Sequence, residues 1–176
     1  MSVYVAIAGI ATLGPGASYM EIMAAGGGIM NTGMTGNVVR NNIFALSGQE
    51  AAWRYSWTKE PPSVVERNIF YLTQGELFHE DGGASDFRSR WDHNLYWHAG
   101  QEVRVYAPGN EPYAQWFRPW AFWRDLGFDQ ASLIADPQFV DTQRHDYRLR
   151  PTSPALKLGF EPIDLSTVGP RPCATR

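Results

Sequence analysis

Residues 38–46 read VVRNNIFAL, residues 64–72 read VVERNIFYL and residues 90–98 read RWDHNLYWH. Each stretch carries an asparagine at the same place, and these asparagines, Asn42, Asn68 and Asn94, follow one another at intervals of 26 residues. Self-similarity at a fixed period of this size is typical of repeat architectures, in which successive units stack on one another. The three stretches therefore predict three successive units of one array.

The residue types inside each repeat favour strands over helices. After the asparagine come an aliphatic and then an aromatic residue, so that equivalent positions hold Ile, Ile and Leu, followed by Phe, Phe and Tyr. Short segments of β-branched and aromatic residues favour β-strands. Parallel strands stack about 4.8 Å apart, so like side chains would form ladders. The asparagine suits a bend, because its side chain can bond nearby backbone groups.

The chain as a whole is expected to form a single domain of stacked strands over residues 1–176. We expect an irregular segment over residues 1–18, coils with long loops over 19–131, and a last coil with a cap over 132–176. The long loops hold most of the Gly, Pro and charge, and loops on a rigid scaffold usually carry function. A short helix is expected from Pro119 to Gly127, because proline favours the first turn and glycine the end. Its tryptophans should pack on the last coils.

Charge and hydropathy exclude several classes of partner. The net charge of −3 gives no basic footprint for nucleic acid or for an anionic membrane surface. The apolar run Val3–Leu13 is too short to span a bilayer, and no basic segment precedes it as in a signal peptide. The open edges at the N-terminal end of a solenoid could instead support a homo-oligomer.

The C-terminal region carries a resemblance to a known group. Residues 132–141 read SLIADPQFVD, and residues 146–160 read DYRLRPTSPALKLGF. With the three repeats, this closely resembles the terminal coils of bacterial right-handed parallel β-helix proteins of the pectate-lyase-like superfamily. The resemblance implies an all-β, right-handed parallel β-helix, a solenoid of 26-residue coils with a C-terminal cap. Residues 28–36 lack the histidines that relatives often carry there.

The same resemblance implies a carbohydrate-active protein with a polysaccharide or oligosaccharide substrate. Glycoside hydrolases acting on plant cell-wall polysaccharide, xylan or pectin in type, belong to this group, and a secreted or periplasmic location would suit it. Two alternatives stay open: a non-catalytic glycan-binding or truncated module, and a polysaccharide lyase. Fold alone does not decide among these chemistries.

Paired carboxylates are the chemistry that glycoside hydrolysis needs. Glu66 and Asp92 share one column of the repeat and would face outward on neighbouring coils, with Asp92 the preferred catalytic residue. Arg40 is the third member of that column and would pair with Glu66. The competing interpretation is therefore a solvated charge ladder.

Two loops supply further candidates. The loop before the third repeat holds Glu80, Asp81 and Asp86, which could provide an acid, a base or a Ca²⁺ site; no other cofactor or metal is expected. We take Asp92, Asp86, Glu66 and Glu80 as the candidate catalytic residues. The candidate substrate-binding residues are Glu50, Arg54, Trp57 and Asp81.

Overall fold

The computed structural model describes residues 5–7, 10–12, 20–21, 30–32, 38–45, 50–55, 64–73, 76–79, 90–106, 117–144 and 146–163. Side chains are described for residues 38–45, 64–73, 90–105, 117–144 and 146–163. Regular structure in these residues is almost all strand, so the chain is all-β. No helix in them is long and apolar enough to cross a membrane.

The strands in the N-terminal two thirds are β1 (Val5–Ile7), β2 (Ile10–Thr12), β3 (Met20–Glu21), β4 (Met30–Thr32), β5 (Val38–Arg40), β6 (Ile43–Ala45), β7 (Glu50–Tyr55), β8 (Val64–Glu66), β9 (Ile69–Leu72), β10 (Glu76–His79), β11 (Arg90–Asp92), β12 (Leu95–His98) and β13 (Arg104–Tyr106). They are followed by β14 (Phe117–Pro119), α1 (Trp120–Asp125), β15 (Leu133–Ile134), β16 (Phe139–Asp141), the 3₁₀ turn η2 (Thr142–Arg144), β17 (Asp146–Leu149) and α2 (Pro154–Lys157).

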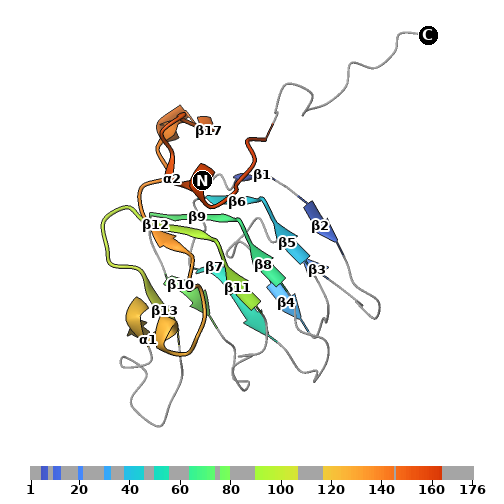
Figure 1. Cartoon of the computed structure of the whole chain (residues 1–176), viewed down its shortest axis with the longest axis vertical. Coiled ribbons are helices and arrows are strands. Elements are labelled where there is room, and N and C mark those ends of the chain that lie inside the picture. The colour runs from blue at the N-terminus through green and yellow to red at the C-terminus, as the bar shows by residue number, and fades with distance from the viewer. Residues whose placement is uncertain are drawn as a thin grey trace, which may run out of the picture.

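Three sheets gather the strands of the repeats. The five-stranded sheet has the order β1-β6-β9-β12-β15, the β8 sheet has the order β11-β8-β5-β2, and the β7 sheet has the order β10-β7-β4-β3. From β4 to β12, consecutive strands therefore pass from the β7 sheet to the β8 sheet and on to the five-stranded sheet, and then begin again. Figure 1 shows β5, β8 and β11 side by side, each leading through a bend into β6, β9 or β12.

The predicted register of the repeats is confirmed. Ile43 pairs with Ile69 and Ile69 with Leu95, and the aromatic residues Phe44, Phe70 and Tyr96 pair in the same way. All these pairings are parallel, at a separation of 26 residues. Because the three repeats have the same length, the strands β6, β9 and β12 meet one another in register.

One hydrophobic core lies between the β8 sheet and the five-stranded sheet. Phe70 stacks on Phe44 and on Tyr96, with ring centroids 5.1 Å apart in both pairs. The β8 sheet contributes Val39, Val65 and Trp91, which are buried in this core. Offset-stacked aromatic rings add to the stabilisation that burial alone provides. The aromatic ladder therefore ties the three repeats together.

A second core lies on the other side of the five-stranded sheet. The aliphatic ladder of Ile43, Ile69 and Leu95 packs there against residues from the C-terminal part of the chain, including Tyr147 and Phe160. Alternate residues of a strand point to opposite faces, so the aliphatic and aromatic columns enter different cores. The C-terminal segment is anchored to the first repeat, where Asn41 Nδ2 donates to Glu161 O at 2.8 Å.

The N-terminal strands run opposite to the strands of the repeats. β1 pairs antiparallel with β6, β2 with β5, and β3 with β4. The prediction that residues 1–18 are irregular is therefore wrong over Val5–Ile7 and Ile10–Thr12. These short strands form because they pair with the open edges of the first repeat. The pairing joins distant parts of the chain, so the period of the repeats does not predict it.

The predicted short helix is confirmed as α1, at Trp120–Asp125. Pro119 precedes its first residue, and Gly127 lies just past its end with a φ of +92°, a value that suits glycine. Trp123 is buried and stacks on Phe128 at 4.1 Å. Trp120 lies over Tyr96 of the third repeat, with centroids 4.7 Å apart. The helix thus packs on the last repeat, as expected.

Candidate functional site

The asparagine column forms a continuous hydrogen-bonded ladder. Asn68 Oδ1 accepts from the backbone N–H and from Nδ2 of Asn42, both at 3.0 Å. Asn94 Oδ1 accepts in the same way from the N–H and Nδ2 of Asn68, at 3.0 and 3.1 Å. The residue before each asparagine has a positive φ, 59° at Asn41, 55° at Arg67 and 58° at His93. The ladder therefore holds three identical bends, each with a strained residue.

The ladder ends on a serine and an aspartate. Ser132 precedes Leu133, which pairs with Leu95, so Ser132 stands where a fourth asparagine would be. Its Oγ accepts from Asn94 N at 2.8 Å, while Asn94 Nδ2 donates to Asp129 Oδ1 at 3.2 Å. Two residues thus share the acceptor role that a single asparagine oxygen plays in each earlier step.

Asp129 is a fully buried carboxylate surrounded by donors. Besides Asn94, it accepts from the Tyr96 hydroxyl at 3.0 Å, from Trp123 Nε1 at 2.7 Å and from Ser132 Oγ at 2.5 Å. No ion pair between described residues involves Asp129. Burial raises the pKa of Asp129, and the hydrogen bonds from its four donors oppose that rise. Burial, with Asp129 nearby, raises the pKa of Tyr96 well above its ordinary value.

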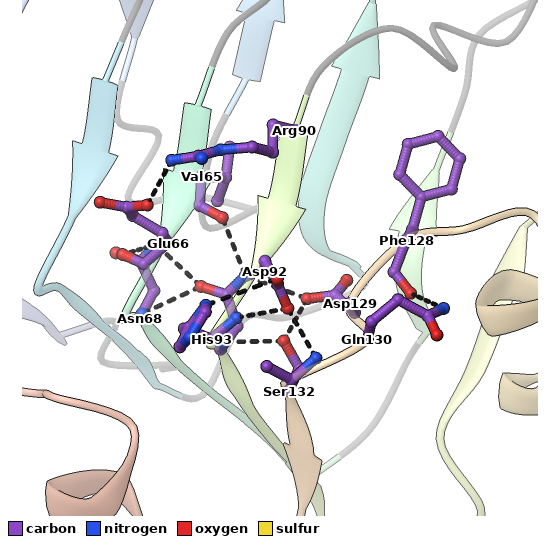
Figure 2. A network of polar contacts seen from close by, with 12 residues as sticks. Val65, Glu66, Asn68, Arg90, Asp92, His93, Phe128, Asp129, Gln130 and Ser132 are labelled. Atoms are coloured by element: carbon purple, nitrogen blue, oxygen red, sulfur yellow. Dashed lines mark hydrogen bonds and ion pairs between the residues drawn. The ribbon is translucent and has the colours of Figure 1, made fainter.

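Asp92 lies at the end of β11, beside the turn that contains Asp129. Its Oδ1 accepts from His93 N at 2.9 Å and from Ala131 N at 2.8 Å, and its Oδ2 lies 3.5 Å from His93 Nδ1. The Asp92 side chain is 29% exposed and that of His93 48%. Figure 2 shows Asp92 between His93 and the Asp129–Ser132 turn. One oxygen is fixed by backbone amides, and the other faces a solvent-accessible imidazole.

Glu66 lies in the same column as Asp92 but in a different environment. Arg40, Glu66 and Asp92 are neighbours across the β8 sheet, as the sequence predicts. Glu66 Oε1 pairs with Arg40 and Oε2 with Arg90, both at 2.7 Å. Only 11% of the Glu66 side chain is exposed, against 43% for Arg40 and 65% for Arg90. The carboxylate predicted to face outward is therefore covered by two guanidinium groups.

The other predicted site residues fall in two groups. Glu50 and Arg54 lie on β7, where their backbones pair with Glu76 and Asn31, and their side chains are not among those described. The remaining four, Trp57, Glu80, Asp81 and Asp86, lie outside the described residues. Only Glu66 and Asp92 are thus seen to come together.

Three residues of the site were not predicted from the sequence. Arg90 pairs with Val64 in the sheet and reaches diagonally to Glu66, so its own column does not reveal the contact. Asp129 and Ser132 lie beyond the regular period, because 38 residues separate Asn94 from Ser132. Aligning SLI of residues 132–134 with NLY of residues 94–96 would have found Ser132.

Within the described part of the chain, no three or more His, Cys, Asp and Glu side chains gather where a metal ion could bind. The predicted Ca²⁺ cluster lies outside that part and stays a prediction. Comparison with known proteins finds no matching family model, no matching curated protein and no matching solved structure. The functional argument therefore depends on the geometry of the site.

Proposed function

We propose that the chain is a right-handed parallel β-helix and a glycoside hydrolase that acts on plant cell-wall polysaccharide. Three facts support the solenoid: strands 26 residues apart pair in parallel, the chain visits the three sheets in a fixed order, and the asparagine bends repeat. Such a scaffold presents outward side chains at the spacing of neighbouring strands, about 4.8 Å.

The observation that carries the proposed reaction is the pairing of Glu66 with Asp92 on adjacent strands. Retaining glycosidases hold two carboxyl groups about 5–5.5 Å apart, a separation close to that between neighbouring strands. Two backbone amides bind Asp92 Oδ1, so a proton on this group would sit on Oδ2. Asp92 is therefore proposed as the group that donates a proton to the leaving oxygen and then accepts one from water.

Glu66 is proposed as the partner carboxylate. Both of its oxygens face guanidinium groups, which suits an anion that stabilises positive charge at the anomeric carbon or forms a bond to it. The guanidinium groups of Arg40 and Arg90 are more exposed than Glu66, and their remaining N–H groups could donate to sugar hydroxyls.

A second candidate is a non-catalytic glycan-binding module. The observation that favours it is the burial of Glu66 beneath two arginines, because a nucleophile must reach its substrate. In this alternative the side chains of Arg40, Glu66, Arg90 and Asp92 bind sugar hydroxyls, and no glycosidic bond is cut.

The test is a panel of xylans, pectins and their oligosaccharides, assayed for reducing-sugar release, for absorbance of unsaturated products and for binding. The wild type is compared with Asp92→Asn and Glu66→Gln, and with Asp136→Asn as a control on an exposed aspartate that also accepts a backbone N–H. Reducing sugar that disappears in Asp92→Asn and Glu66→Gln but not in the control supports hydrolysis. Binding without turnover supports the module, and unsaturated products support a lyase.

A further inference from the structure

The turn that holds Asp92 is built around Asp129. Ser132 N donates to Asp129 O at 3.2 Å, closing a four-residue turn, and Asp129 itself has a φ of +48°. Inside this turn Ser132 Oγ donates to Asp129 Oδ1 at 2.5 Å. The carboxylate therefore fixes a backbone conformation that few residues adopt without such support.

The same turn is fastened to the strand that bears Asp92. Asp129 N donates to Trp91 O at 2.9 Å, on the residue directly before Asp92, and Ala131 N donates to Asp92 Oδ1 at 2.8 Å. The Asp129 side chain also binds Trp123 of α1 and Asn94 of the ladder. One backbone amide beside Asp92 thus belongs to a turn held by a buried group that makes no hydrogen bond with the Asp92 side chain.

We infer that Asp129 is a positioning residue, which sets the orientation of the Asp92 carboxyl through the Ala131 amide. The inference rests on the proposed function only in taking Asp92 as the reacting carboxyl. Asp129→Asn keeps the size of the side chain but replaces one oxygen with an NH₂ group. Trp123 Nε1 and Asn94 Nδ2 can only donate hydrogen bonds, so the NH₂ group that this substitution introduces cannot accept from them. The turn therefore loses at least one of the hydrogen bonds that hold it.

The first measurement follows the amide protons of Ala131 and His93 by NMR as the full-length protein is titrated with acid. In the wild type both amides bind Asp92 Oδ1, so both signals should shift as that carboxyl takes up a proton, and the part of the Ala131 shift that persists in Asp92→Asn is assigned to the neighbouring Asp129 and subtracted. In Asp129→Asn we expect the response of Ala131 to be lost and that of His93 to remain. The His93 amide is an internal control, because it adjoins Asp92 in the chain.

The second measurement is turnover of the glycan identified by the panel. Asp129→Asn should lower kcat about tenfold or more with little change in KM, since misplacing a reacting group costs rate while the binding surface stays intact. Asp136→Asn should leave kcat unchanged. Ser132→Ala keeps the Asp129 carboxylate but removes its tie to the turn, and it should give the same result if Asp129→Asn does not fold.

An Ala131 signal that follows the Asp92 titration as in the wild type, in whichever of these variants folds, would overturn the inference. So would a kcat within about twofold of the wild type. Should the wild type cleave no glycan, the proposed hydrolase function fails, and the NMR titration still decides whether Asp129 orients Asp92.

Discussion

At the scale of single residues, the same column of the β8 sheet carries two carboxylates with different surroundings. Glu66 is neutralised by two arginines, whereas Asp92 is held by backbone amides beside a histidine. The difference comes from position within the stack. Glu66 has a repeat on each side, while Asp92 stands in the last full repeat, next to the turn that follows.

The ion pairs of Glu66 predict a salt-dependent loss of stability in Glu66→Gln. We expect the free energy of unfolding to fall by about 1 kcal/mol at low salt, because the half-exposed arginines are partly screened by water. The difference should shrink in about 1 M NaCl, where charges are screened within a few ångströms. Urea unfolding at both salt concentrations measures it. A loss independent of salt would show that packing, and not charge, is responsible.

The middle asparagine of the ladder should be far more sensitive. Asn68 Nδ2 donates to Val39 O and Glu66 O, and its oxygen binds Asn42. Asn68→Ala removes these buried hydrogen bonds together with those that Asn68 accepts and donates along the ladder, so we expect a loss of about 3 kcal/mol or more in urea unfolding. Gln143→Ala, an exposed control, should change stability by less than about 0.5 kcal/mol. Equal losses in the two variants would contradict a role for the ladder in stability.

At the scale of elements, the strands are too short to be stable alone. β5, β8 and β11 have three residues each, so their order depends on stacking between repeats. The aromatic column supplies that stacking in the first core, and the aliphatic column supplies it in the second.

Phe70 is the central residue of the aromatic column, and its removal should uncouple the repeats. We expect Phe70→Ala to lower the free energy of unfolding by about 3–5 kcal/mol, the usual cost of a large cavity in a core. Leu133→Ala, at a position that is 40% exposed, should cost less than about 1 kcal/mol. Thermal and urea unfolding followed by circular dichroism compare the two. A small effect at Phe70 would mean that the stack adds little.

At the scale of the whole molecule, the regular repeats were predictable and the irregular connections were not. The columns at Asn42, Asn68 and Asn94 follow from an exact period, because stacking forces like residues into register. The pairing of Arg40 with Glu66 follows from the same register. The Asp129 network was missed because the last segment departs from that period. Glu66 was expected to be exposed, but Arg90 reaches it from a different column.

The buried Asp129 predicts how stability varies with pH. Its raised pKa means that the folded protein binds this proton more tightly than the unfolded chain. The contribution of Asp129 to the free energy of unfolding is therefore greatest below its unfolded pKa of 3.8. This contribution is lost as the pH rises through the pKa of Asp129 in the folded protein. The stability of the wild type relative to Asp129→Asn should thus be higher at about pH 4 than at about pH 7.

Asp146 provides a matched control for this measurement. Its hydrogen bond with Arg148 lowers its pKa to about 2, so its contribution is lost only as the pH falls below 3.8 toward that value. Between about pH 4 and pH 7 the difference between the wild type and Asp146→Asn should stay nearly constant. Urea unfolding across the range tests both variants. If the difference in free energy of unfolding between the wild type and Asp129→Asn did not change with pH, burial of the Asp129 charge would not be destabilising.

The side-chain to side-chain hydrogen bonds of the asparagine ladder all point the same way, since Asn42 donates to Asn68, Asn68 to Asn94 and Asn94 to Asp129. A duplicated 26-residue segment inserted between Asn68 and Asn94 would add one more asparagine to the ladder. That asparagine would have an asparagine side chain on each side as its hydrogen-bond partner, as Asn68 has now. The last asparagine of the lengthened series would still donate to the carboxylate of Asp129, as Asn94 does now. The protein should therefore lengthen by whole repeats while its closing turn stays unchanged.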